Sequence, residues 1–177
     1  MQVFWARGYD SASTRDLLEA MKISRSSLYQ AFGNKEQLFL EALRRYRGNL
    51  IDRLNRQLEA SPSAMHFLQE LFGQTALEAG SERAALGCLI FNSASELGQR
   101  DDIPSIEAKR SVQAITALFH EAVVRSQAEG DIASDRDALA LATYLTLGMA
   151  GLRTLLKSGA DPAQTRAAAE LLLDTLR

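Results

Sequence analysis

Apolar residues recur at every third or fourth position along most of the chain, and this spacing places them on one face of an α-helix. The clearest example is residues 35–58, where the recurring positions are Phe39, Leu43, Tyr46, Leu50 and Leu54. No segment shows the strict alternation of apolar and polar residues that is typical of a β-strand. The pattern predicts an all-α protein.

Helix start and stop signals divide the first sixty residues into four helices. The apolar first segment ends at Gly8, a residue type that is common just after a helix C-terminus. Ser13, Ser24 and Asn34 are N-cap residue types, and each precedes a segment with helical spacing. The second and third of these helices are short, whereas the fourth is long.

Five further helices are predicted beyond Pro62, where the pattern of the fourth helix is broken. They cover residues 63–79, 87–97, 105–130, 135–159 and 162–177. None of these segments is strand-like, and the chain contains no internal repeat and no low-complexity tail.

Composition agrees with this picture. Hydrophobic residues make up 46% of the 177 residues and aromatic residues 7%, and only three prolines interrupt the chain. No apolar run approaches the roughly 20 residues of a membrane span, and the N-terminus lacks the charge and hydropathy pattern of an export signal. The single cysteine allows no internal disulfide. We therefore expect a cytoplasmic protein with no membrane partner.

Charge is unevenly distributed along the chain, although the net charge is only −2. Residues 1–47 carry eight Lys or Arg and five Asp or Glu, while the remainder carries 12 basic and 17 acidic residues. This asymmetry suggests a nucleic-acid-binding head on an acidic body.

The first three predicted helices have the order of a helix-turn-helix, in which two short helices joined by a tight turn dock on a preceding helix. The second helix of such a unit enters the major groove of DNA with its N-terminal residues near the base edges. Helical spacing directs Ile23, Leu28 and Phe32 inward. It leaves these side chains on or near the exposed side: Arg25, Ser26, Ser27, Tyr29 and Gln30.

Two side chains in this region suit particular DNA contacts. The amide of Gln30 can pair with N6 and N7 of adenine, which makes it the candidate for base reading. Lys35 lies at the start of the fourth helix, where a phosphate is favoured.

Residues 4–39, FWARGYDSASTRDLLEAMKISRSSLYQAFGNKEQLF, resemble the tetracycline-repressor (TetR) family of bacterial transcription regulators. The resemblance implies a DNA-binding head followed by a divergent helical domain that dimerises and binds an inducer. By position it places these residues against operator DNA: Thr14, Arg15, Arg25, Ser26, Ser27, Tyr29, Gln30 and Lys35. Tyr29 and Lys35 would mainly hold phosphates.

The sequence departs from the family pattern at a few points. Lys22 stands in the turn where the family usually has glycine, so a left-handed backbone there would cost about 1 kcal/mol or more. Ala31 replaces a frequent histidine and removes one phosphate donor. The family's first helix normally begins a turn or two before the position of Met1, so we expect the first helix to be truncated here.

The predicted domains are residues 1–47, which bind DNA, and residues 48–177, which bind ligand and dimerise.

An inducer pocket is expected inside the second domain, because pockets of this kind are mainly apolar with a few polar groups that orient the ligand. The candidate lining residues are Phe67, Leu71, Cys88, Phe91, Asn92, Phe119, Tyr144 and Met149. Asn92 and Tyr144 are the polar candidates among them.

Homodimerisation is expected through the last two helices, residues 135–158 and 162–177, packed as a four-helix bundle across a two-fold axis. Residues 138–152 are too apolar for a lone surface helix, and Gly148 and Gly151 would let two backbones approach closely. The alternative is that this helix is the buried centre of the monomer.

Other classes of function have less support in the sequence. An enzyme that uses Cys88 as its nucleophile would need a motif that is absent here, such as a nucleophile elbow or a phosphate-binding glycine loop. His66 has Glu70 one helical turn away but no third ligand, and His120 has no carboxylate or thiol one turn away on either side, so we expect no metal and no cofactor. Two alternatives remain open: a thiol-based sensor of electrophiles or oxidants that uses Cys88, and a helical interaction module that has lost DNA binding. For Cys88 we favour inert packing over sensing.

Overall fold

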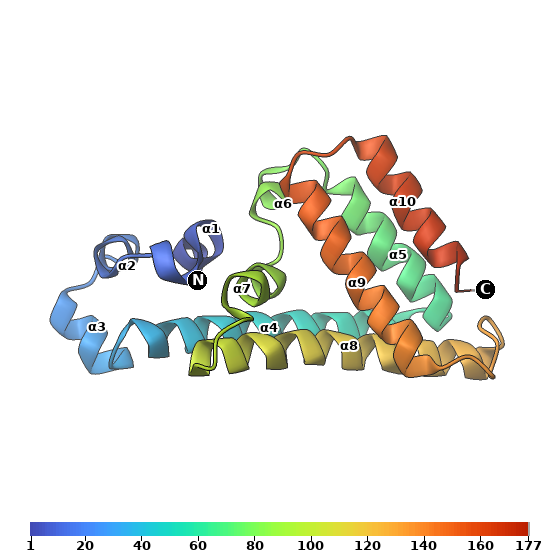
Figure 1. Ribbon diagram of the computed structural model, residues 1–177, viewed down its shortest axis with the longest axis horizontal. Coiled ribbons are helices and arrows are strands. Elements are labelled where there is room, and N and C mark those ends of the chain that lie inside the picture. The colour runs from blue at the N-terminus through green and yellow to red at the C-terminus, as the bar shows by residue number, and fades with distance from the viewer. Residues whose placement is uncertain (177) are drawn as a thin grey trace. The chain divides into compact units, whose positions relative to one another are not determined.

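The computed structural model describes residues 1–176, which form ten α-helices and no strand (Figure 1). The helices are α1 (Gln2–Ser11), α2 (Thr14–Met21), α3 (Arg25–Phe32), α4 (Lys35–Ala60), α5 (Ala64–Leu77), α6 (Glu82–Leu86), α7 (Leu89–Leu97), α8 (Ile103–Glu129), α9 (Ala138–Lys157) and α10 (Pro162–Asp174). The predicted all-α class is confirmed and each predicted helix is present, although α1 continues past its predicted end at Gly8 to Ser11.

The structure adds one helix that the sequence pattern does not predict. α6 is only five residues long, and the Ser81 hydroxyl caps it by accepting a hydrogen bond from the Ala84 amide at 3.1 Å. A helix this short has no repeating apolar face, so periodicity cannot reveal it. α8 also begins earlier than expected, at Ile103, because Pro104 is tolerated in the first turn of a helix.

The chain divides into two compact units that are not the predicted domains. The first unit contains residues 1–49 and 88–112, and the second contains residues 50–87 and the chain from residue 113 onward. α4 and α8 each contribute to both units, and the chain enters the first unit a second time at Cys88. The functional boundary between residues 47 and 48 stays a prediction.

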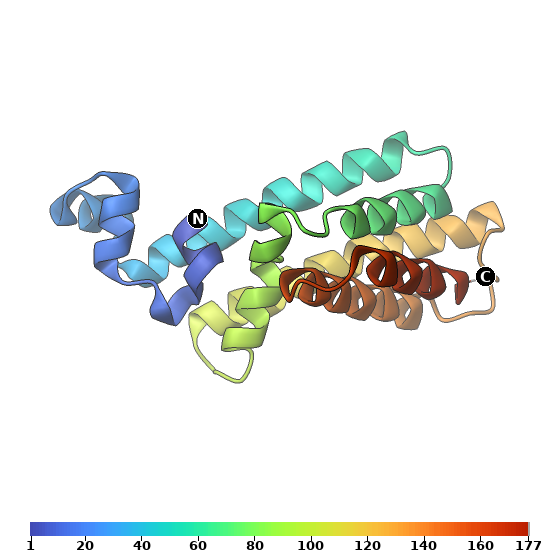
Figure 2. The same cartoon turned by 90° about the horizontal axis from the view of Figure 1, so that it is seen from above.

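The first unit is built around buried side chains of α1–α4. Phe4, Leu17, Leu28, Phe39 and Leu43 are almost completely buried. The rings of Phe4 and Phe39 meet edge to face, with 5.2 Å between their centroids. The packing holds the three short helices together beside the N-terminal part of α4 (Figure 2).

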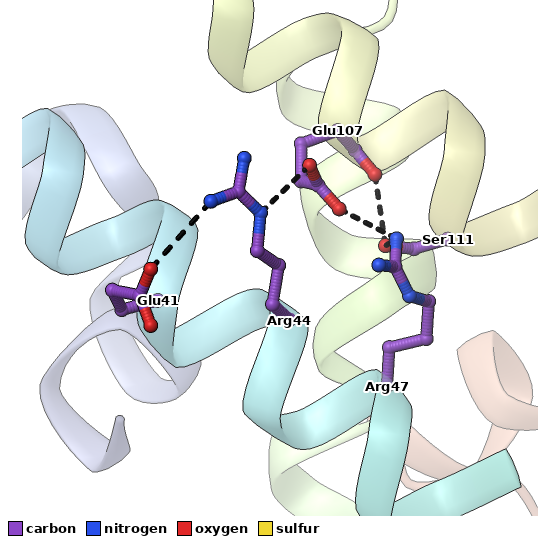
Figure 3. A network of polar contacts seen from close by, with 5 residues as sticks. All are labelled: Glu41, Arg44, Arg47, Glu107 and Ser111. Carbon is purple, nitrogen blue, oxygen red and sulfur yellow. Dashed lines mark hydrogen bonds and ion pairs between the residues drawn. The ribbon is translucent and has the colours of Figure 1, made fainter.

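A buried carboxylate joins α4 to α8 within the first unit (Figure 3). Glu107 of α8 is 3% exposed, and it accepts hydrogen bonds from Arg44 Nε at 3.0 Å and from Arg47 Nη1 at 2.5 Å. The Ser111 hydroxyl lies 3.3 Å from Arg47 Nη1 and donates to the Glu107 carbonyl at 2.8 Å. This network fixes the N-terminal half of α4 against the start of α8.

The turn between α2 and α3 has a left-handed backbone at Lys22, with φ 55° and ψ 41°. Lys22 is the one non-glycine residue with positive φ in the part of the chain that the structure describes. The conformation expected for the family's glycine is therefore present, although a lysine occupies the position.

Replacing Lys22 with glycine is expected to raise the free energy of unfolding by about 0.5–1 kcal/mol. The left-handed conformation costs a residue with a Cβ roughly 1–2 kcal/mol, and the greater freedom of glycine in the unfolded chain offsets about 0.4–1 kcal/mol of the gain. Urea denaturation without DNA measures the change. Lys22→Ala keeps the Cβ and is the control, so equal stability of the two variants would contradict this explanation.

The second unit has an aromatic core between α5 and α8. Phe67, Leu68, Phe72 and Phe119 are almost completely buried, and the rings of Phe72 and Phe119 lie 6.0 Å apart. α10 packs on α5 and α9, and α9 and α10 run side by side (Figure 2).

The end of α8 organises the break between α4 and α5. Arg125 donates to the carbonyl oxygens of Leu58 at 2.6 Å and Ser61 at 3.1 Å, which caps the end of α4. Glu129 accepts a hydrogen bond from the Ala64 amide at 2.7 Å at the start of α5, and this bond, followed by that from Arg125, lowers the pKa of the Glu129 carboxyl. Two side chains one turn apart therefore satisfy backbone groups of both helix ends.

The sequence analysis expects no apolar run that approaches the length of a membrane span, and the length and composition of α9 contradict this expectation. Within residues 1–176, α9 is long and apolar enough to cross a bilayer. The core helix of a soluble protein passes the same test, and α9 packs against α5, α6 and α10 in the second unit. The match is weak evidence for a membrane.

Candidate DNA-binding site

Residue Ser13 fixes the start of α2 through a reciprocal capping box. Its hydroxyl accepts a hydrogen bond from the Asp16 amide at 3.1 Å, and Asp16 Oδ2 accepts one from the Ser13 amide at 3.0 Å. Bonds from the hydroxyl and amide of Ser13, together with Arg7 at 2.7 Å, lower the pKa of the Asp16 carboxyl. Leu17 is buried, whereas Arg15 is exposed and Thr14 is half-buried.

α3 presents one polar face to solvent. Leu28 is completely buried and Ile23 and Phe32 are half-buried, as the helical spacing predicts. The exposed residues are Arg25, Ser26, Ser27, Tyr29 and Gln30. All five side chains that the sequence predicts to face DNA from this helix are therefore accessible.

Three serine hydroxyls gather at the start of α3. Ser24 accepts a hydrogen bond from the Ser27 amide at 3.1 Å, and its hydroxyl lies 2.8 Å from that of Ser26 and 2.9 Å from that of Ser27. Farther along the helix, the Arg25 guanidinium lies 5.8 Å from the centre of the Tyr29 ring, within cation–π distance. The face thus combines hydroxyl groups, a cation and an aromatic ring, with Gln30 beside them.

Lys35 is held partly by the protein itself. Asn34 caps α4 by accepting from the Gln37 amide at 2.8 Å, and the Lys35 ammonium donates to the Asp10 carbonyl at 3.2 Å while lying 4.8 Å from the centre of the Tyr9 ring. An ammonium has three donors, so a phosphate contact remains compatible with this geometry. The link to α1 has no signal in the sequence, because Asp10 and Lys35 are 25 residues apart.

The sequence also gives no signal for the contacts that connect α1 to α7 and to the segment just after α7. Glu96 accepts hydrogen bonds from the amides of Tyr9 and Asp10, and Arg100 forms an ion pair with Asp10. The family-like Gly-Tyr pair at residues 8 and 9 marks the place but gives no indication of its partner.

The predicted inducer residues divide between the two units. Cys88, Phe91 and Asn92 belong to the first unit, and the other five belong to the second. Phe67 and Leu71 line a cavity of about 600 Å³, together with these mainly polar residues: Arg53, Gln57, Ala60, Ser61, Pro62, His66, Glu70, Gln74, Thr75, Glu78 and Arg153. Phe119 and Met149 are buried core residues, and the Tyr144 hydroxyl accepts a hydrogen bond from Thr175 at 2.9 Å. Ligand binding by the predicted set stays a prediction.

Cys88 is buried and occupies the N-cap position of α7. The Tyr46 hydroxyl donates to its sulfur at 3.8 Å. The burial fits a packing role, and its proposed alternative role as a redox sensor stays a prediction.

Comparison with known proteins identifies the family. Residues 1–42 match the family described as bacterial regulatory proteins, tetR family, and residues 64–172 match the tetracyclin repressor-like C-terminal domain. The chain belongs to the TetR family. Its predicted class of function, a DNA-binding transcriptional regulator with an N-terminal helix-turn-helix, is thereby confirmed.

Individual TetR relatives support the same conclusion. The chain is 30% identical over 162 residues to the uncharacterized HTH-type transcriptional regulator YezE of Bacillus subtilis, covering 91% of this chain and 84% of that protein. It is 29% identical over 168 residues to the HTH-type transcriptional repressor ComR of Escherichia coli, covering 91% and 77%. A structure of the TetR regulator CifR, a cysteine mutant complexed with 26-bp double-strand operator DNA, is 34% identical with a TM-score of 0.85, covering 99% of this chain and 92% of that chain. These TetR relatives are transcriptional regulators, not enzymes.

Proposed function

We propose that this TetR protein is a homodimeric repressor that reads a pseudo-palindromic operator with α3 and is released by a small-molecule inducer. The observation that carries the proposal is the exposed polar face of α3 on a buried Leu28 anchor. A second copy related by a two-fold axis would place its own α3 in the next half-site.

Different residues of the site have different roles in this proposal. Gln30 and Ser27 influence sequence choice, because amide and hydroxyl groups form hydrogen bonds with base edges. The remaining predicted residues supply affinity through phosphates and position α3: Thr14, Arg15, Arg25, Ser26, Tyr29 and Lys35.

Substitution of Gln30 and of Arg15 should separate these roles. Gln30→Ala is expected to lose about 1–3 kcal/mol of discrimination at one base pair in each half-site, which binding-site selection on random DNA would show as relaxed preference there. Arg15→Ala is expected to weaken binding to all sequences alike and to reduce the salt slope by about 1 for each phosphate that the wild-type arginine neutralises. An altered base preference in Arg15→Ala with an unchanged salt slope would reverse the assignment.

The proposed dimer uses an apolar row on the exposed side of α9. Tyr144, Leu147 and Leu155 are exposed, and together with the exposed Gly151 they recur at steps of three or four residues, which places them on one face of the helix. Exposed apolar rows of this kind mark interaction surfaces. Gly151 has open space around it, whereas a Cβ at Gly148 would overlap Leu172 of α10. Gly148 therefore serves the packing of α9 on α10 within one chain, and Gly151 is left for the approach of a partner.

The inducer is proposed to bind the cavity lined by Phe67 and Leu71. Its wall carries Arg153, whose guanidinium is paired with Glu78 at 2.6 Å and lies 3.3 Å from the Thr75 hydroxyl. A ligand that binds more tightly to the conformer in which the two DNA-binding domains are wrongly spaced for the operator shifts the population away from the operator-bound state.

A variant with a filled cavity should separate induction from DNA binding. Compounds that raise the melting temperature of the protein in a library screen are expected to release it from its operator. Leu71→Trp should block that release while leaving operator affinity within about twofold, because Leu71 lies outside the first unit. Equal release of the variant by every active compound would remove the cavity from the proposal.

A further inference from the structure

Helix α1 is interrupted at Gly8, whose φ of 81° and ψ of 178° are not helical. The residues that follow start a new helical turn, and the first amides of any helical turn lack an acceptor within the helix. Here the amides of Tyr9 and Asp10 both donate to the carboxylate of Glu96 in α7, at 2.9 and 2.8 Å. One side chain therefore satisfies two backbone donors that are 87 and 86 residues away in sequence.

The backbone at Gly8 leaves space for this carboxylate. A Cβ at Gly8 would lie 2.6 Å from Glu96 Oε2 and 2.9 Å from Glu96 Oε1, closer than atoms can approach without displacement. Gly8 is therefore favoured twice: for its positive φ, and because a Cβ there would displace the Glu96 carboxylate from its hydrogen bonds.

The same short segment is tied to the start of α4. The Asp10 carbonyl accepts from Lys35, and the Tyr9 ring packs 4.7 Å from the ring of Phe39. Hydrogen bonding by Arg100 also lowers the pKa of the Asp10 carboxyl. Residues 8–10 thus connect α7 on one side with the helix that follows α3 on the other, all within the first unit (Figure 1).

We propose that Glu96 is a positioning residue for DNA binding: its carboxylate fixes α1 on α7 and thereby holds α2 and α3 in the orientation that the operator requires. Hydrogen bonds from amides to an ionised carboxylate are stronger than bonds between neutral groups. Because two such bonds hold α1 at its interruption, the helix-turn-helix is held in one orientation relative to α7. Glu96 acts through α1 and contacts no DNA itself. The proposal rests on the DNA-binding role of the chain and on the proposed two-fold dimer.

The test is Glu96→Gln in the full-length chain, with Asp101→Asn as the matched control. The amide keeps the size of the side chain but offers one acceptor in place of two. The affinity of the Glu96→Gln protein for an operator site selected by the wild type is expected to fall about tenfold or more. This is the effect of losing one charge-assisted bond in each of two subunits. The salt slope should stay unchanged, because Glu96 neutralises no phosphate. Asp101 is exposed and lies shortly after α7, so its variant makes the same change in charge and should bind as the wild type does.

Amide hydrogen exchange distinguishes positioning from a purely structural role. The amides of Tyr9 and Asp10 are expected to exchange at least about tenfold faster in Glu96→Gln, at a temperature where both proteins are fully folded. Fast exchange with wild-type operator affinity would overturn the proposal, and so would unchanged exchange. Gly8→Ala disturbs the contact from the α1 side, so it should reproduce the loss of operator affinity. If Glu96→Gln does not fold, Gly8→Ala tests the positioning role of Glu96 in its place. The oligomeric state of the wild type is measured first by sedimentation. A monomeric wild type would contradict only the proposed dimer, and the variants would still test the role of Glu96.

Discussion

Replacing Leu147 with aspartate is expected to convert the protein to a monomer and to lower its specific DNA affinity by about a hundredfold or more. Leu147 is 67% exposed in the single chain, so the substitution removes little packing from the fold. In the proposed dimer the same position faces a partner helix, where an unpaired carboxylate would lose its hydration. Two linked heads gain roughly 10²–10⁴ in avidity over one head, and the monomer loses that factor.

Sedimentation velocity and operator titration measure these two effects on the same samples. Val124→Asp is the control, because Val124 is also exposed, at 46%, but lies on α8 outside the last two helices. Val124→Asp should remain dimeric with wild-type affinity. A dimeric Leu147→Asp that binds the operator normally would show that α9 does not form the interface.

Removing the Glu107 carboxylate is expected to lower the free energy of unfolding by about 1.5–3 kcal/mol. Glu107→Ala would take the carboxylate partner from Arg47 and leave Arg44 only its longer contact with Glu41 (Figure 3). The loss comes from the charge-assisted hydrogen bonds to Glu107, and water reaches the two arginines, which are 43% and 26% exposed, and compensates part of it.

Chemical denaturation compares this variant with Glu41→Ala. Glu41 also contacts Arg44, at 3.5 Å, but its side chain is 62% exposed. Exposed pairs contribute about 0–1 kcal/mol, so this control should be close to the wild type. Equal stability of the two variants would show that the Glu107 network contributes no more to the free energy of unfolding than an exposed ion pair does.

Local signals in the sequence are sufficient for the described helices other than α6 and for the exposed face of α3. Ser13 and Ser24 determine where α2 and α3 begin, because each hydroxyl satisfies an amide three residues later in the chain. Leu28 and the exposed side chains around it follow from helical spacing alone. These features depend on neighbours within one or two turns, which the sequence displays directly.

Interactions between distant segments cannot be predicted in the same way. Glu107 meets Arg44 across 63 residues, and Glu96 meets Tyr9 across 87. A glutamate on a helical pattern is usually a solvated residue, and only the fold shows which one is buried. The sequence predicts a phosphate contact for Lys35 but not its bond to Asp10, since nothing in the local pattern reveals an acceptor from α1.

The proposed inducer residues show the same limit. Apolar residues in a helical body can line a cavity or fill the core, and their spacing is identical in the two cases. Phe67 and Leu71 line the cavity, whereas Phe119 is buried against Phe72. The polar part of the lining, including Arg153, comes from helices that the sequence pattern does not bring together.

Binding-site selection from random double-stranded DNA with the full-length protein tests whether a dimer reads its operator with α3. The proposed dimer predicts enrichment of one pseudo-palindromic sequence whose half-sites lie about one helical turn of DNA, or a multiple of it, apart. It also predicts that Gln30→Ala relaxes one base pair in each half-site symmetrically. Enrichment of a single unpaired half-site, or no enrichment at all, would contradict a dimer that reads its operator with α3.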